Sequence, residues 1–246
     1  MSISTSRESI AGYEPVLEPS LVGVALPELA RPSPALFRLR SAQPSRRAVL
    51  HLQAAGDPVV PADLAGWFTE RACHFYLVGL RLPGRVLPGR PARRANGRAV
   101  AQLDAACARL HDVDGMEHVI LSAQGRAAMV AALWCDRQRE GWRAGEPQLP
   151  IADALILYQP IWPARQRPRL SIGCPVLALS GQPARSRLRL RRQRPAPHLG
   201  DHVTWLQMPE VVDAVSLAGP GRRAFFDELG RWLGAYMYGF AGDKLL

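Results

Sequence analysis

Residues 114–134 read DGMEHVILSAQGRAAMVAALW and contain the pattern from which the fold class is predicted. Residues 118–121 are a short apolar run with β-branched members, which is typical of a strand buried on both faces. Residues 126–139 are rich in alanine and predict a helix. Gly125 lies between the two segments. A strand, a tight turn and a helix in this order are the repeating unit of a parallel sheet.

The same alternation extends in both directions along the chain. Short apolar runs that predict strands alternate with stretches whose apolar residues are spaced by three and four, as in amphipathic helices. A loop rich in Pro, Gly and Arg is expected at residues 81–96. The predicted strands are residues 49–52, 75–80, 118–121, 153–158, 175–179 and 202–207, and the predicted helices are residues 61–68, 100–110, 126–139 and 222–238.

This alternation predicts the α/β fold class, with a mostly parallel sheet, helices on both of its faces and right-handed crossovers. The sequence has no internal repeat and no linker that divides it, so residues 36–246 are expected to form a single domain. Residues 1–35 contain several prolines and show little periodicity. We interpret them as an N-terminal arm with one or two short edge strands.

The composition is that of a globular protein, with 246 residues, 48% hydrophobic and 21% charged, which is enough to bury a sizeable core. No run of 18 or more apolar residues occurs, so no membrane-spanning segment is expected. Residues 1–14 are polar and lack the apolar stretch of a secretory signal. The four cysteines are far apart and form no CxxC pair, so we expect buried free thiols and a cytoplasmic location.

The chain carries a net charge of +10, and every basic residue except Lys244 is an arginine. Such a charge raises the question of nucleic acid, but an arginine excess of this kind also follows from GC-rich coding. The segment from Arg165 to Arg194 contains nine arginines and no acidic residue. Because its only aromatic neighbour is Trp162, nucleic acid is not the expected partner. A solvated loop is the favoured interpretation of this segment, and a patch that binds an anion is the alternative.

Two stretches carry a family likeness: residues 49–84, which include WFTER and LRLPG, and residues 114–134. They resemble the α/β-hydrolase superfamily, and more narrowly the actinobacterial serine hydrolases of the monoacylglycerol lipase and lysophospholipase type. Residues 222–236 also resemble the last helix of these enzymes. The resemblance covers roughly residues 36–240 and implies a three-layer α/β-hydrolase-like fold.

The resemblance implies a nucleophilic serine in a Gly-x-Ser-x-Gly turn between a strand and a helix. The matching residues are LSAQG at 121–125, which put Ala123 at the nucleophile position. A methyl group cannot attack a carbonyl carbon. Ser122 is a candidate substitute, but it lies one residue early, and one step along a strand reverses the direction of the side chain.

The other two members of the catalytic triad are also missing where the resemblance places them. The base is expected within residues 208–216, where Asp213 takes the place of the histidine. No histidine follows His202, which begins the last predicted strand and so lies at the wrong end of the sheet. The triad acid is expected after the strand at residues 175–179 or somewhat later. Residues 154–200 contain no Asp or Glu, so the acid is missing unless Asp201 or Asp213 substitutes.

Residues at the carboxyl ends of the predicted strands are candidates for a residual pocket, because open α/β sheets bind ligands at that edge. Gln53 and Ala54 replace the His-Gly pair that the resemblance implies for the oxyanion loop, where backbone N–H groups can still point at an anion. Asp57 follows in the same loop, and a structural role in the turn is favoured over a catalytic one. Tyr158 and Trp162 either line the pocket or pack in the core. The predicted pocket residues are Gln53, Ala54, Asp57, Ala123, Gln124, Tyr158, Trp162 and Asp213.

Three functional hypotheses follow from these departures. The first is a pseudohydrolase that acts as a ligand-binding or interaction module, with a small apolar or anionic ligand or a second copy of the chain as partner. The triad is missing, and residues 159–174 leave room for little or no cap domain, so this hypothesis is favoured.

The second hypothesis is a non-hydrolytic enzyme of secondary metabolism, a cyclase, isomerase or lyase, with Asp57 or Asp213 as its acid. The third is a serine ester hydrolase with a displaced nucleophile such as Ser122 or Ser180. No metal or cofactor is expected, and the sequence names no substrate.

Overall fold

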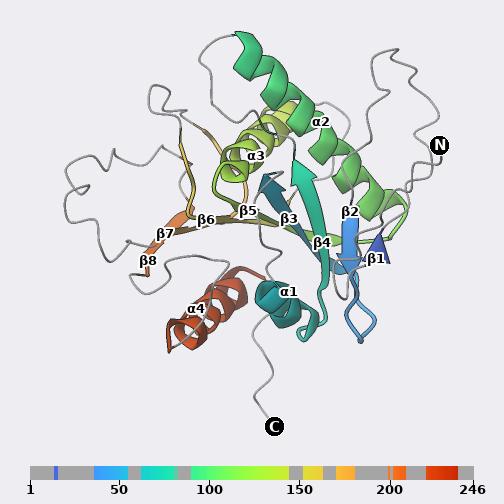
Figure 1. Ribbon diagram of the computed structural model, residues 1–246, viewed down its shortest axis with the longest axis vertical. Coiled ribbons are helices and arrows are strands. Elements are labelled where there is room, and N and C mark those ends of the chain that lie inside the picture. The colour runs from blue at the N-terminus through green and yellow to red at the C-terminus, as the bar shows by residue number, and fades with distance from the viewer. Residues whose placement is uncertain are drawn as a thin grey trace, which may run out of the picture.

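The computed structural model describes residues 14–15, 36–54, 62–80, 82, 90–143, 152–162, 170–180, 199, 202–208 and 220–237. These residues form a sheet of eight strands with helices on both of its faces (Figure 1). The strands are β1 (Glu14–Pro15), β2 (Leu36–Leu39), β3 (Arg47–Ala54), β4 (His74–Leu80), β5 (His118–Gln124), β6 (Ala154–Tyr158), β7 (Val176–Ser180) and β8 (Val203–Gln207). The helices are α1 (Ala62–Thr69), α2 (Arg90–Asp112), α3 (Ala127–Arg143) and α4 (Pro220–Tyr236).

The sheet is antiparallel at one end and parallel through the rest. Its strand order is β1-β2-β4-β3-β5-β6-β7-β8. β2 runs antiparallel to both β1 and β4, and every neighbouring pair from β4 to β8 is parallel. The parallel strands therefore end along one edge of the sheet, which we call the carboxyl edge, and begin along the opposite amino edge. The mostly parallel sheet predicted from the sequence is confirmed.

Helices cover the two faces of the sheet in pairs, with α2 and α3 on one face and α1 and α4 on the other (Figure 1). Alternate residues of the central strands pack into the two resulting cores. Leu50 and Leu52 of β3 lie in the core that Trp134 of α3 helps to form, which we call the α2–α3 core. Val49 lies with Phe68 of α1 in the opposite α1–α4 core. Burial of both faces explains why the strands are apolar throughout.

The start of α2 differs from the sequence prediction. The helix begins at Arg90, so the loop predicted at residues 81–96 is wrong over its second half. Pro91 stands in the first turn, where its missing N–H is not needed for a helical hydrogen bond, and the Arg and Ala residues that follow favour a helix. The apolar spacing on which the prediction depended occurs only in the later turns, where Leu103 and Leu110 are buried.

Two sequence predictions concern segments that the structure describes only in part. Of residues 1–35 it describes Glu14–Pro15, which form β1 beside β2, so the division into an arm and a single domain stays a prediction. Of the link between β6 and β7 it describes residues 159–162 and 170–175, and these contain no helix. Within the described part of the chain, no helix is both long enough and apolar enough to cross a membrane.

Candidate functional site

The chain turns sharply at the carboxyl edge where β5 passes into α3. β5 ends at Gln124, α3 begins at Ala127, and Gly125 between them has a positive φ of 54°. Glycine adopts this left-handed conformation without the steric cost that a Cβ brings. The Gly125 N–H donates to the Tyr158 carbonyl oxygen at 2.9 Å, and the Gly125 carbonyl oxygen accepts from the Ile161 N–H at 2.9 Å. These bonds fasten the turn to β6 and to the segment that follows it.

The strand-to-helix turn lies two residues later than the match of residues 121–125 to the hydrolase motif predicts. Ala123 is fully buried within β5, and its methyl group packs in the α2–α3 core rather than at the carboxyl edge. The residue at the strand-to-helix turn is Gly125, which the sequence comparison matched to the last glycine of the motif. A match centred on Gly125 flanks it with Ala123 and Ala127, which are small as a tight turn requires. This even spacing of two alanines is the sequence signal that could have placed the turn.

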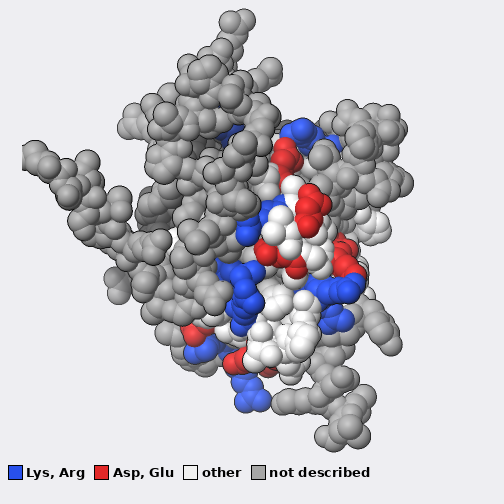
Figure 2. All heavy atoms as spheres, turned by 90° about the vertical axis from the view of Figure 1, so that its right-hand side faces the viewer, with Lys and Arg blue, Asp and Glu red and all other residues white. Residues whose placement is uncertain are grey.

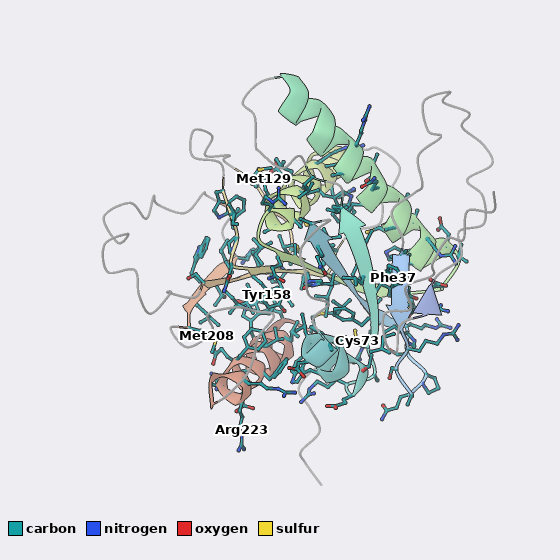
Figure 3. All side chains as sticks on the ribbon, viewed as in Figure 1. Phe37, Cys73, Met129, Tyr158, Met208 and Arg223 are labelled. Carbon is teal, nitrogen blue, oxygen red and sulfur yellow. The ribbon has the colours of Figure 1, made fainter. Side chains whose placement is uncertain are left out.

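The space above Gly125 is bordered by an apolar side chain. Among the described residues, a Cβ placed on Gly125 would contact only Ile161, whose Cδ1 would be 3.8 Å away. Ile161 is 58% exposed, and Trp162 beside it is half-buried against the α2–α3 core. Tyr158 lies below the sheet in the α1–α4 core, with its ring centroid 5.9 Å from that of Phe225 (Figure 3). Within the described residues, the turn therefore has space for a Cβ on Gly125 beside Ile161, whereas Tyr158 is part of the core.

Three of the predicted pocket residues, Gln53, Ala54 and Gln124, lie at the carboxyl ends of β3 and β5, which are neighbours in the sheet. Gln53 and Gln124 are half-buried, and Ala54 is buried. The structure therefore brings these three residues to the same edge as the β5–α3 turn. Asp57 and Asp213, which were predicted for the same site, lie outside the described residues.

A second polar feature, which the sequence interpretation missed, lies within the sheet. His51 of β3 and Ser122 of β5 are partners across the two parallel strands. His51 Nδ1 and Ser122 Oγ are 2.8 Å apart and form a hydrogen bond. The centroid of the imidazole ring is 5.7 Å from that of Phe75 and 6.2 Å from that of Tyr158, so both side chains face the α1–α4 core. The available signal was a histidine and a serine, each within an otherwise apolar strand.

Burial sets the protonation of this pair. His51 is 1% exposed, and burial lowers the pKa of its imidazole from 6.5 to about 3, because the imidazolium would lose its hydration. Burial also raises the pKa of Tyr158 above its usual range, with the Ser122 hydroxyl acting weakly in the opposite direction. Both rings are therefore neutral near pH 7.

A catalytic base must accept a proton readily, must be held by a partner on its second nitrogen, and must serve a nucleophile that the substrate can reach. His51 has a low pKa, and its Nε2 has no hydrogen-bond partner among the described residues. Ser122 is 0% exposed. The pair has the hydrogen bond of a catalytic dyad, but the histidine is not basic and a substrate cannot reach the serine. We therefore interpret the pair as a structural link between β3 and β5.

The remaining histidines that the structure describes lie at the amino edge, away from the β5–α3 turn. α2 ends at this edge because it leads into the start of β5. His198 lies outside the described residues. In the described ranges, no imidazole therefore shares the carboxyl edge with Gly125. The amino-edge histidines are His74 at the start of β4, His118 at the start of β5, His202 just before β8 and His111 in the last turn of α2.

The described surface shows neither a metal centre nor a basic patch on the face that Figure 2 presents. No group of three or more His, Cys, Asp or Glu side chains in the described ranges could hold a metal ion. On the described part of that face, Arg side chains are interspersed with Asp and Glu (Figure 2). Most of the segment from Arg165 to Arg194 lies outside the described residues, so its role stays a prediction.

No protein-family model matches the chain, and no curated protein matches it in sequence. Solved structures do match it. A carboxylesterase from Mesorhizobium loti is similar with a TM-score of 0.52 and 16% identity over 82% of this chain and 96% of that chain. A hormone-sensitive lipase from a metagenome library has a TM-score of 0.51 and 15% identity over 83% of each chain. A sugar hydrolase from Lactococcus lactis has a TM-score of 0.54 and 11% identity over 85% of this chain and 97% of that chain. Identities this low concern the fold alone, and they agree with the strand order and layers: the chain has a three-layer α/β-hydrolase-like fold.

Proposed function

We propose that this chain is a catalytically degenerate α/β-hydrolase-fold protein that acts as a ligand-binding or interaction module, with its site at the carboxyl edge around Gly125. One observation carries the proposal. The turn in which a hydrolase of this fold holds its nucleophile is occupied by Gly125, which has no side chain, and no imidazole in the described ranges lies at that edge.

The nucleophile position lacks a hydroxyl group whichever of the two residues is matched to it. Centred on Ala123 the nucleophile position holds a methyl group, and centred on Gly125 it holds a hydrogen atom. An acyl transfer by this fold also needs a base to remove the proton of the nucleophile and an acid to orient the base. Asp213 stands at the base position of the sequence match, and no Asp or Glu occurs within residues 154–200.

A serine hydrolase with a displaced nucleophile is the second candidate, and the 2.8 Å hydrogen bond between His51 and Ser122 favours it. The complete burial of Ser122 counts against it, because a substrate would have to enter the α1–α4 core to reach the hydroxyl. Ser180 at the end of β7 is half-buried and more accessible. None of the described histidines lies near the carboxyl end of β7 to activate it.

A small apolar or anionic ligand suits the proposed site. The exposed Ile161 offers an apolar contact beside Gly125, and the first turn of a helix such as α3 favours a negatively charged group. We further propose a cytoplasmic location, which the four cysteines support because the structure leaves all of them reduced and buried. A homodimer and the narrower likeness to monoacylglycerol lipases stay predictions, as does a cyclase, isomerase or lyase.

The decisive test is labelling of the full-length protein with a fluorophosphonate, read by intact mass, beside a short-chain nitrophenyl ester assay. A serine esterase of known activity serves as the positive control, and Ser122→Ala is the matched variant. We expect no adduct and no ester turnover above buffer for either form of this protein, because the described structure offers no activated hydroxyl at the carboxyl edge.

Two other outcomes would change the conclusion. A stoichiometric adduct that disappears in Ser122→Ala would establish the displaced nucleophile and refute the pseudohydrolase. An adduct that persists in Ser122→Ala would also refute the pseudohydrolase and would place the displaced nucleophile at another residue, with Ser180→Ala as the next variant.

A further inference from the structure

One turn of α3 runs along the segment that leads into β7. The Ser171 N–H donates to Asp136 Oδ1 at 2.5 Å, and Arg139 Nη1 donates to the Ile172 carbonyl oxygen at 3.2 Å. Gly173 lies against the same arginine, since a Cβ there would be 3.6 Å from Arg139 Cδ. These contacts come from different side chains of one helical turn, so the helix and the segment are held together at several points.

Two cysteines meet inside this contact. Cys135 lies on α3 and Cys174 lies two residues before β7, and their thiols are near enough to interact, since the Cys174 thiol is the first cause of the raised pKa of Cys135. They are 5% and 8% exposed, and both belong to the α2–α3 core. Cys107 of α2 lies in the same core, whereas Cys73 lies across the sheet in the α1–α4 core (Figure 3). All four are free thiols.

We propose that Cys135 and Cys174 are an oxidisable pair that forms a disulfide within the folded protein and joins α3 covalently to the start of β7. The proposal names a two-electron oxidant such as hydrogen peroxide or diamide. With peroxide, one thiol becomes a sulfenic acid and releases water, and the other thiol then attacks that sulfur and releases a second water. The two thiols give up two electrons and two protons, and the peroxide is reduced to two molecules of water.

The surroundings of the two thiols set the rate of oxidation and do not change which thiol Cys135 reacts with. Interaction with the Cys174 thiol and then burial raise the pKa of Cys135 above its usual range, which keeps the thiol protonated. Because the thiolate is the reactive form, the pair is expected to oxidise slowly compared with an exposed cysteine and to remain reduced in a reducing compartment. The contact between α3 and the β7 segment keeps the two sulfurs together during that time.

The test is an alkylation count on the folded, full-length protein. After prolonged incubation with excess diamide, the protein is unfolded in the presence of N-ethylmaleimide and its intact mass is measured. The reduced protein takes up four maleimides, one for each cysteine, and the oxidised protein is expected to take up two. A peptide map without reductant is expected to link Cys135 to Cys174. In Cys135→Ala and Cys174→Ala the three remaining thiols are all expected to stay free, whereas Cys73→Ala, the matched control, still loses two.

A melting scan of the parent protein gives a readout that needs no variant. The disulfide is expected to raise the melting temperature by about 5–10 °C, because it closes a long loop in the unfolded chain, and dithiothreitol is expected to reverse the change. Uptake of four maleimides after oxidation would overturn the proposal. A link from Cys107 to either partner would overturn it as well. If one alanine variant fails to fold, the other variant and the peptide map of the parent still decide the outcome.

Discussion

The amino edge and the carboxyl edge of this sheet are built from different kinds of residue. At the amino edge, Asp114 accepts a hydrogen bond from the Tyr76 hydroxyl at 3.1 Å. The same carboxylate lies 3.3 Å from Arg38 Nη1 and 4.0 Å from Arg109 Nε. This cluster ties β2, β4 and α2 to the start of β5, and its charged side chains are largely buried.

At the carboxyl edge, the described strand ends offer amides and backbone instead. Gln53, Gln124, Gly125 and Ile161 lie there, and Arg126 is the charged side chain among the described residues next to the turn. In parallel α/β proteins, chemistry is found at the carboxyl edge. Among the described residues, the ionic cluster that supports the fold therefore lies at the amino edge, whereas Arg126 is the charged side chain beside the turn at the carboxyl edge.

The largest effect is expected at the amino edge. Asp114→Ala leaves Arg38, Arg109 and the Tyr76 hydroxyl without their shared acceptor, so the free energy of unfolding is expected to fall by about 2–4 kcal/mol. Urea unfolding measures the change. The matched control is Glu117→Ala, which removes an exposed ion pair with Arg46 and is expected to cost less than about 1 kcal/mol. Equal effects of the two variants would refute the special role of Asp114.

A smaller loss is expected inside the sheet. Ser122→Ala removes the partner of His51 Nδ1 in a fully buried position, which is expected to destabilise the protein by about 1–3 kcal/mol. Ser180→Ala, which changes a half-buried hydroxyl at the end of β7, is the control and is expected to change stability little. Unfolding in urea compares the two variants. A Ser122→Ala protein as stable as the parent would show that the hydrogen bond contributes nothing to the fold.

Stability is also expected to depend on pH through His51. Its pKa is about 3 in the folded protein and 6.5 in the unfolded chain, so between these values only the unfolded chain binds the proton. The contribution of His51 is therefore fully present above pH 6.5 and is lost as the pH falls toward 3. Between pH 7 and pH 5 the loss is about 1–2 kcal/mol. His74, whose pKa burial also lowers, acts in the same direction.

The measurement for this prediction is urea unfolding at pH 7 and pH 5 in the parent and in His51→Gln. The variant lacks the titrating imidazole, so its stability is expected to change less between the two pH values. The same pH dependence in both proteins would mean that His51 is not the group responsible.

The smallest effect is expected at the carboxyl edge, where no gain of hydrolysis should follow from adding a hydroxyl. Gly125→Ser fits the available space but lacks an imidazole beside it, so its ester turnover is expected to equal that of Gly125→Ala, the control for backbone strain at positive φ. Ala123→Ser is likewise expected to be inactive, because its hydroxyl would be buried in the α2–α3 core. Turnover by Gly125→Ser alone would reveal a base and restore a hydrolase interpretation.

The fold could be predicted because burial on both faces makes each parallel strand a continuous apolar run, as in residues 118–121. The first turns of α2 could not, since an arginine-rich stretch such as residues 90–96 has no apolar period to detect. The turn at Gly125 was misplaced because a motif with one remaining glycine can be matched in two registers, and only the backbone conformation distinguishes them.

The candidate site was predictable in part. Gln53 and Gln124 could be placed at the carboxyl edge because they directly follow apolar strands. The pairing of His51 with Ser122 could not be foreseen, since it depends on which strands are neighbours, and periodicity along one strand carries no such information. Asp57 and Asp213 stay predictions.

The hydrogen bond between His51 and Ser122 also bears on how the sheet assembles. β3 and β5 are adjacent in the sheet but are separated along the chain by α1, β4 and α2, so their pairing is a long-range step. A slip of β5 by one residue would turn Ser122 into the α2–α3 core and set the Ala123 methyl group against the imidazole. Such a chain would bury two polar groups without partners, which is costly. The pair therefore disfavours misaligned strands during folding and helps to select a single arrangement of the central sheet.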